Sequence, residues 1–198
     1  MTVILAHKDN FTQGRTKEID RIVLHYTAGD GDTAENNGKY FAGGGRNASA
    51  HYFVDEKGVV QSVADGDTAW HAGNWEMNCR SIGVEMCSKK DGAGNYYIPA
   101  ATVKNAQTLV KHLMAKHSID IDGVIRHYDV TGKACPAPMV AQEKWKAFLS
   151  GLMEPQAASW AAEAWENAKA KGVLDGTRPG DALTRQELAV ILQRLKLI

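Results

Sequence analysis

Short apolar runs, rich in β-branched and aromatic residues, recur through the first two-thirds of the chain and predict buried strands. Polar turns and glycines separate these runs. The turn at 55–58 joins two of them closely enough to predict a β-hairpin. The predicted strands are 21–27, 48–54, 59–63, 81–87 and 124–128.

Helical patterns lie between and after these strands. Apolar residues recur near helical spacing from Thr102 to His117, which predicts a long amphipathic helix, and shorter helices are predicted at 33–42 and 140–152. Strands that alternate with helices indicate one α/β domain, which we place at residues 1–152. Since one connection is a tight hairpin, we expect a mixed central β-sheet flanked by helices.

The C-terminal part of the chain has a different pattern. Residues 153–156 have the composition of a linker, and an Ala-rich helix is predicted over Trp160–Lys171. A capping box of Thr184 and Glu187 predicts the start of a last helix, which should run to the C-terminus. We therefore predict a small helical domain at 156–198. It has little core of its own, so it should pack on the first domain or on a second copy, as a homodimer.

The charges and the apolar runs of the chain argue against two classes of partner, nucleic acids and membranes. Lysine and arginine number 23, aspartate and glutamate also number 23, and the formal net charge is zero. A basic nucleic-acid-binding surface is therefore not expected. No apolar run reaches membrane-spanning length and no polybasic or amphipathic anchor stands out, so we expect no insertion into a membrane.

The cysteines and the N-terminus bear on the compartment. Three cysteines at irregular spacing do not form a disulfide framework, which favours folding in a reducing compartment. The N-terminal stretch MTVILAHKDN lacks the charged and apolar regions of a secretion signal. We therefore expect the protein to be made in the cytoplasm, and another factor would have to release it if its substrate lies outside.

Two histidines occupy positions where the pattern calls for apolar residues. His25 lies inside the predicted strand at 21–27, His127 lies inside the one at 124–128, and Cys135 follows eight residues after His127. Two imidazoles and a thiolate suit zinc by donor type. Three protein ligands leave one tetrahedral position open, as in catalytic zinc sites. Spacing alone leaves another interpretation open, with two hydrogen-bonded core histidines and an inert buried thiol.

Two charged residues near these positions are candidates for catalysis. Glu85 lies between Val84 and Met86 in an apolar strand, where a carboxylate is costly unless it is paired or used. Burial would raise its pKa toward the range of a general base. The alternative is a glutamate at the solvated end of a strand. Lys133 precedes Cys135 by two residues and could stabilise an oxyanion, although a lone loop lysine is more often only solvated.

Five ordered motifs resemble one family. Together they look like the zinc N-acetylmuramoyl-L-alanine amidases, whose amidase-2 fold occurs in phage endolysins, bacterial autolysins and peptidoglycan recognition proteins. The resemblance covers residues 1–150. The motifs are VLHYTA (23–28), SAHYFVD (49–55), AWHAGN (69–74), SIGVEMC (81–87) and RHYDVTGKACP (126–136).

The resemblance implies a role for each residue that matches a family position. Glu85 matches the general base of the endolysin branch, and Lys133 matches the lysine near the metal. Some members carry a catalytic tyrosine where this chain has Ala50, which leaves Glu85 as the sole base. The implied Zn²⁺ ligands are His25, His127 and Cys135, and the implied substrate-binding residues are His71 and Asn74.

The implied activity is that of an endolysin or autolysin. Such an enzyme cleaves the amide bond between N-acetylmuramic acid and L-alanine of bacterial peptidoglycan, and acts on the wall after release from the cell. Two alternatives stay open, a recognition protein that binds peptidoglycan without cutting it and a cytosolic amidase that recycles muropeptides. The presence of Cys135 argues against the first, because non-cleaving recognition proteins lack that ligand.

The C-terminal stretch from Trp160 to Leu195 resembles a single S-layer-homology-like repeat. Such modules are associated with cell walls, so the resemblance implies a wall-binding module and argues against a recycling enzyme. The alternative is an assembly module, in which the face carrying Trp160 and Trp165 drives dimerisation.

Overall fold

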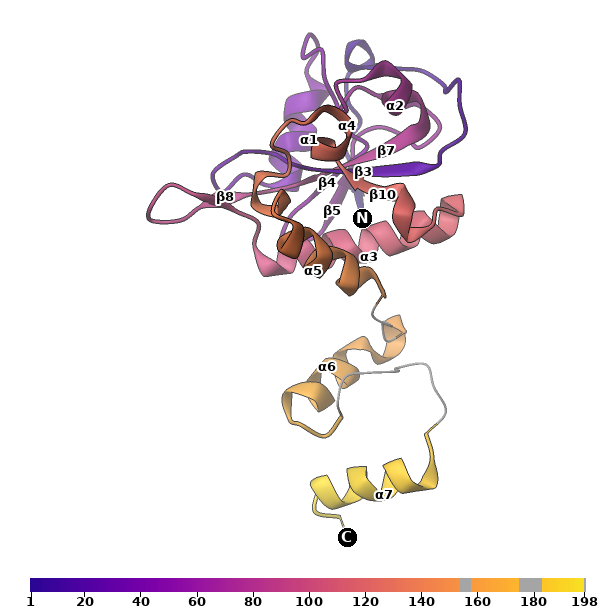
Figure 1. The fold of residues 1–198 in the computed structure, drawn as a ribbon, viewed down its shortest axis with the longest axis vertical. Helices are drawn as coiled ribbons and strands as arrows, with labels where there is room; N and C mark the ends of the chain where they lie inside the picture. The colour runs from indigo at the N-terminus through magenta and orange to yellow at the C-terminus, as the bar shows by residue number, and fades with distance from the viewer. Residues whose placement is uncertain (154–157, 175–182, 198) are drawn as a thin grey trace. The chain divides into compact units, whose positions relative to one another are not determined.

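The computed structural model describes residues 1–153, 158–174 and 183–197. The chain divides into two compact units, Met1–Leu152 and Met153–Ile198, and each is described by itself. Figure 1 shows the first unit as a sheet with helices packed against it.

A six-stranded sheet forms the centre of the first unit. Only the pair formed by β4 (Tyr52–Val54) and β5 (Val59–Gln61) is antiparallel, and it is the predicted hairpin. Asp55 Oδ1 holds its turn by accepting from the N–H groups of Lys57 (2.7 Å) and Gly58 (3.0 Å). The other pairs of this sheet are parallel, which confirms the predicted mixed sheet. In spatial order the strands are β1 (Thr2–Val3), β5 (Val59–Gln61), β4 (Tyr52–Val54), β7 (Ser81–Met86), β3 (Arg21–Tyr26) and β10 (Val124–Arg126).

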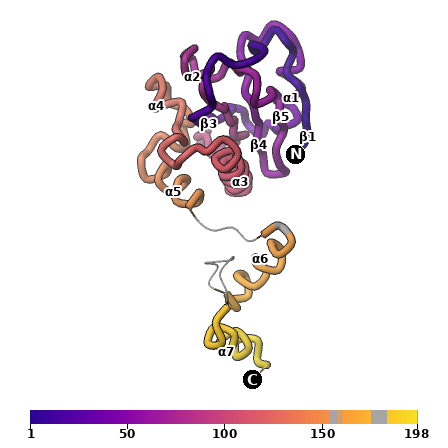
Figure 2. The backbone as a smooth tube through the Cα atoms, turned by 90° about the vertical axis from the view of Figure 1, so that its right-hand side faces the viewer, coloured from indigo at the N-terminus to yellow at the C-terminus, as the bar shows by residue number. Residues whose placement is uncertain are grey.

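Helices cover both faces of this sheet. Helices α3 (Ala100–His117) and α5 (Gln142–Met153) run side by side beneath one face (Figure 1, Figure 2), where Gln107 Nε2 donates to the carbonyl of Phe148 at 3.0 Å. Helix α1 (Ala34–Ala42) packs on β4 and β5 from the other face. Successive side chains of β4 point to opposite faces of the sheet. Tyr52 and Val54 belong to the hydrophobic core beneath α3, and Phe53 belongs to the core beneath α1.

Smaller elements complete the two units. Strand β2 (Phe11–Thr12) pairs with β6 (Thr68–Ala69), and β8 (Lys89–Lys90) pairs with β9 (Tyr96–Tyr97), each as an antiparallel ribbon. The remaining elements are η1 (Lys8–Asn10), β2 (Phe11–Thr12), β6 (Thr68–Ala69), α2 (Trp75–Arg80), β8 (Lys89–Lys90), β9 (Tyr96–Tyr97), η2 (Ile121–Gly123), α4 (His127–Thr131), η3 (Ala137–Met139), η4 (Ser159–Ala161), α6 (Ala162–Ala170) and α7 (Arg185–Arg194).

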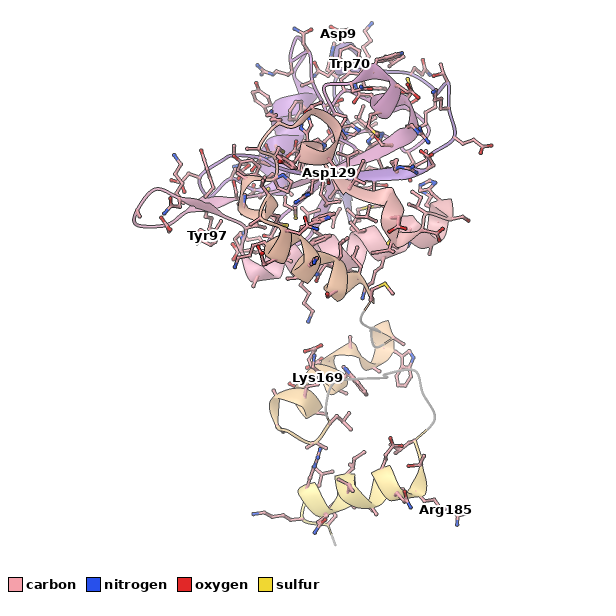
Figure 3. The ribbon with its side chains drawn as sticks, viewed as in Figure 1. Asp9, Trp70, Tyr97, Asp129, Lys169 and Arg185 are labelled. Carbon is pink, nitrogen blue, oxygen red and sulfur yellow. The ribbon has the colours of Figure 1, made fainter. Side chains whose placement is uncertain are left out.

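The predicted strand at 124–128 is two residues too long. It ends at Arg126, and His127 begins the short helix α4. The side chain of Asp129, labelled in Figure 3, accepts from the main-chain N–H of Arg126 at 2.9 Å and pairs with its guanidinium at 2.7 Å. This cap by the Asp129 carboxylate starts a helix at the point where the apolar pattern alone predicts extended chain.

The second unit contains the α-helices α6 and α7 and the short 3-10 helix η4 within its described residues. The predicted capping box is present, because Thr184 Oγ1 accepts from the Glu187 N–H at 3.1 Å and the Thr184 N–H donates to Glu187 Oε2 at 2.9 Å. Helix α7 ends at Arg194 rather than at the C-terminus. Most of the predicted linker at 153–156 lies outside the described residues. Neither unit has, in the part that is described, a helix long and apolar enough to cross a bilayer.

Asp65 ties the end of α3 to the sheet. Its carboxylate, 8% exposed as a residue, accepts from Tyr52 Oη (2.5 Å), Lys116 Nζ (2.8 Å) and His117 Nε2 (2.9 Å). Burial raises the pKa of Asp65, but these hydrogen bonds outweigh it and lower the pKa to about 2. Since the folded pKa lies below the unfolded value, ionised Asp65 stabilises the fold above the unfolded pKa. That contribution is lost as the pH falls through about 2.

Replacing Asp65 by alanine is expected to lower the free energy of unfolding by about 1–3 kcal/mol near neutral pH, because Tyr52 loses its buried acceptor. Urea unfolding measures this loss. The difference in unfolding free energy between wild type and Asp65→Ala should narrow as the pH falls from about 4 to about 2. The exposed Asp122→Ala is the control and should change stability by less than about 0.5 kcal/mol. An equal loss in both variants would contradict the role of Asp65.

Candidate active site

Three neighbouring parallel strands, β7, β3 and β10, end at the same edge of the sheet. His25 lies near the end of β3, and Glu85 is its cross-strand partner on β7. His127 follows directly after β10. Because the carboxyl ends of parallel strands meet at one edge, three polar side chains from distant parts of the sequence converge there.

The loop after α4 brings a thiol to the same place. Gly132 turns the chain with φ +77°, and the Tyr128 N–H donates to the carbonyl of Cys135 at 2.8 Å. Cys135 Sγ then lies 3.7 Å from His25 Nδ1, and His25 Nδ1 lies 3.1 Å from His127 Nδ1. The three donor atoms all lie within 4.8 Å of one another and all three residues are buried. The cluster could hold one metal ion.

The electrostatics of the cluster suit a cation. Burial, followed by the neighbouring charges of His127 and Lys133, lowers the pKa of His25 well below its usual value. Burial followed by Lys133 also lowers the pKa of His127. Both rings are therefore neutral near pH 7 and can offer a lone pair. Burial, followed by Glu85, raises the pKa of Cys135 to about 12, so the thiol loses its proton only when a cation replaces it.

Glu85 faces the cluster with an unused oxygen. Among the residues that the structure describes, its buried Oε2 has no hydrogen-bond partner. Burial raises the pKa of Glu85 to about 8, although the Lys133 ammonium opposes this shift. A buried carboxylate without a partner is costly, and such a group is well placed to exchange a proton with a ligand.

A cavity of about 180 Å³ connects these groups. Lys133 is exposed on the loop before Cys135 and lines the cavity beside Glu85. Aromatic and small side chains such as Trp70 and Ala50 also line the cavity. Of the seven residues predicted from the sequence, six line this cavity, namely His25, His71, Glu85, His127, Lys133 and Cys135.

The two predicted substrate-binding residues differ in their surroundings. His71 lines the cavity, and its Nδ1 lies 3.0 Å from Nε2 of His25. Asn74 lies outside the cavity lining, and its Oδ1 accepts from the Met77 N–H at 3.0 Å as the cap of α2. Contact of either residue with a substrate stays a prediction.

Three residues that support the site were not singled out from the sequence. Asn78 Oδ1 accepts from the main-chain N–H groups of His71 (3.1 Å) and Ala72 (2.8 Å). Ser81 Oγ lies 3.3 Å from His71 Nε2. Gly83 leaves room for the His71 ring, since a Cβ there would lie 2.5 Å from His71 Cγ. Only Gly83 carried a signal, because glycine inside an apolar strand indicates a close approach.

The sequence relatives are amidases. CwlL of Bacillus licheniformis, described as an N-acetylmuramoyl-L-alanine amidase, is 39% identical over 135 residues, which cover 61% of this chain and 36% of the relative. BlyA of Bacillus subtilis, described in the same way, is 34% identical over 145 residues, which cover 64% of this chain and 38% of the relative. The match thus spans little more than a third of the length of either relative.

Solved structures share the fold of the first unit. The catalytic domain of XlyA superposes with a TM-score of 0.67 at 28% identity, over 76% of this chain and 97% of that domain. A mutant endolysin from Bacillus subtilis superposes with a TM-score of 0.66 at 30% identity, over the same shares. The Amidase_2 family profile, described as N-acetylmuramoyl-L-alanine amidase, matches residues 15–138. That match spans more than half of the chain and includes the whole His–His–Cys cluster, so the chain belongs to the Amidase_2 family of N-acetylmuramoyl-L-alanine amidases.

Proposed function

We propose that this chain is a peptidoglycan hydrolase of the endolysin or autolysin kind, which cleaves the amide bond between N-acetylmuramic acid and L-alanine. The observation that carries the proposal is the unpartnered carboxylate oxygen of Glu85 in one cavity with the His25–His127–Cys135 cluster. A donor cluster beside a free buried base is the arrangement that hydrolysis of an amide requires.

The metal we propose is Zn²⁺, held by His25, His127 and Cys135. Zinc bond lengths separate two nitrogen ligands by about 3.3 Å, and a nitrogen from a sulfur by about 3.6 Å, in a tetrahedral site. Two of the three donor–donor distances here, 3.1 Å and 3.7 Å, are close to these values, and all three donor atoms lie within 4.8 Å of one another. The donor types and these two distances support zinc. When bound, zinc supplies Lewis acidity, which lowers the pKa of water toward neutrality and polarises a carbonyl.

The chain's own residues move the protons and stabilise the charge. Glu85 accepts a proton from the attacking water and later gives it to the nitrogen of L-alanine, so that the C–N bond breaks and a carboxylic acid and an amine leave. The ammonium of Lys133 stabilises the negative charge on the former carbonyl oxygen. As the resemblance implies, His71 and Asn74 are the candidate contacts to the substrate.

Digestion of purified cell wall tests the bond that is cut. Mass spectrometry should find stem peptides with a free N-terminal L-alanine, and zinc analysis should find about one ion per chain. New reducing sugar ends would show that a glycosidic bond is cut instead. Zinc binding without peptide release would identify a protein that only recognises the wall.

For residues 156–198 we propose wall binding, supported by the S-layer-homology-like sequence and by exposed apolar side chains. Trp160 is 90% exposed, and Leu188 and Val190 on α7 are 44% and 46% exposed.

Deleting residues 156–198 should lower the fraction of protein that sediments with insoluble cell wall, by about tenfold if the unit supplies about 1.4 kcal/mol of binding free energy. The molecular mass in solution should stay that of a monomer. A full-length dimer that dissociates on deletion would assign the unit to assembly instead.

A further inference from the structure

His71 lies between the proposed metal site and the start of β7. Its Nδ1 is 3.0 Å from Nε2 of His25, and its Nε2 is 3.3 Å from Oγ of Ser81. Ser81 is fully buried, and its Oγ lies 2.5 Å from the main-chain carbonyl oxygen of Met77. A line of hydrogen bonds therefore runs from a helix carbonyl to a metal-binding imidazole.

The donor and the acceptor of each hydrogen bond in this line follow from the Met77 carbonyl at one end of it. A carbonyl oxygen can only accept, so the hydroxyl of Ser81 donates to Met77 and is free to accept from the Nε2–H of His71. A neutral imidazole carries one N–H, so His71 Nδ1 is an acceptor and takes the Nε2–H of His25. The lone pair of His25 is left on Nδ1, the atom that faces His127 and Cys135.

We propose that His71 is a positioning residue of the metal centre, which fixes His25 in the tautomer and ring orientation that present Nδ1 to the metal. The proposal rests on the metal site assigned above. Metal-binding histidines commonly donate their second N–H to a carboxylate, a carbonyl or water, and here an uncharged imidazole takes that place. Both nitrogens of His71 already have hydrogen-bond partners, so the contact to a substrate proposed above would be made by the carbon atoms of the ring.

The backbone around His71 is built to hold this arrangement. Asn78 Oδ1 accepts from the N–H groups of both His71 and Ala72. Gly83 leaves the space that the His71 ring occupies. Asn78 and Gly83 thus hold the His71 ring in its place beside His25.

The test compares His71→Leu with His71→Asn in the full chain. The two side chains have nearly the same shape, but only asparagine can offer an oxygen near the position of Nδ1. Zinc affinity, measured by competition with a chelator, should fall about 10–100-fold in His71→Leu and stay within about threefold of wild type in His71→Asn. Equal affinity in His71→Leu and wild type would overturn the proposal, and so would equal losses in both variants.

A second pair keeps the test decisive if His71→Leu does not fold. Ser81→Ala removes the group that fixes the tautomer of His71, and it should weaken zinc binding and shift the absorption bands of the Co²⁺-loaded protein. Ser88→Ala is the matched control, because Ser88 is equally buried and donates to a carbonyl, that of Gly29, outside this line. Indistinguishable affinities and spectra for the two serine variants would overturn the proposal. Wild type that binds no zinc would instead overturn the metal site itself.

Discussion

Glu85→Gln is expected to lose turnover by about 10²–10⁴-fold while it keeps the fold and one zinc ion per chain. Glutamine has the shape of glutamate but cannot take a proton from water. The zinc ligands are untouched, because Glu85 acts from the neighbouring strand. Release of stem peptide from purified wall measures turnover, and the exposed Glu143→Gln on α5 is the control. Near-normal turnover in Glu85→Gln would rule out Glu85 as the base.

The same variant should reveal the cost of holding Glu85 in the site. Burial raises the pKa of Glu85 from 4.5 to about 8, so in metal-free protein its ionisation opposes folding. A group whose pKa is raised on folding contributes most below its unfolded pKa, and that contribution is lost as the pH rises through the folded pKa. Urea unfolding with a chelator present should therefore show Glu85→Gln gaining stability over wild type from about pH 5 to about pH 8. A difference in unfolding free energy between Glu85→Gln and wild type that stays constant over that range would contradict the raised pKa of Glu85.

The sequence was sufficient for the main strands and helices of the first unit, and for a physical reason. Short apolar runs rich in β-branched residues are typical of buried strands, and apolar residues at helical spacing are typical of amphipathic helices, so the strands around His25 and Glu85 and the long helix α3 follow from them directly. His127 shows the limit of this reasoning. The Asp129 cap, a side-chain interaction, starts a helix there and overrides the apolar pattern.

The supporting contacts of the site could not be predicted in the same way. His71 and His25 are 46 positions apart, and their contact depends on how β6 and β3 are placed by the rest of the fold. Glu85 and His25 could be singled out because each is a polar residue within an apolar strand, and Cys135 because it follows His127 by eight residues. Ser81 and Asn78 are ordinary polar residues in the sequence, and only their buried hydrogen bonds reveal a role.

Cys135→Ala is expected to abolish zinc-dependent activity, because it removes the only sulfur ligand of the proposed site. Loss of a direct ligand should cost at least the roughly 100-fold in zinc affinity that loss of a ligand's hydrogen-bond partner can cost. Cys79→Ala is the matched control, since Cys79 is an equally buried free thiol outside the cluster. Chelator competition and peptide release measure the two effects, and a Cys135→Ala variant that binds zinc as tightly as wild type would exclude the thiolate ligand.

The pH dependence of zinc affinity gives an independent test of the same ligand. Burial raises the pKa of the Cys135 thiol to about 12, so near neutral pH a metal ion must displace one proton from it. The pKa values of His25 and His127 are lowered, so these rings are already neutral and release none. Glu85, whose pKa is raised to about 8, would also release a proton, so the measurement uses Glu85→Gln as the background. In that background zinc affinity should rise about tenfold per pH unit from about pH 7 to about pH 8, and the slope should vanish when Cys135→Ala is added. A slope that persists in the variant would mean that the displaced proton comes from another group.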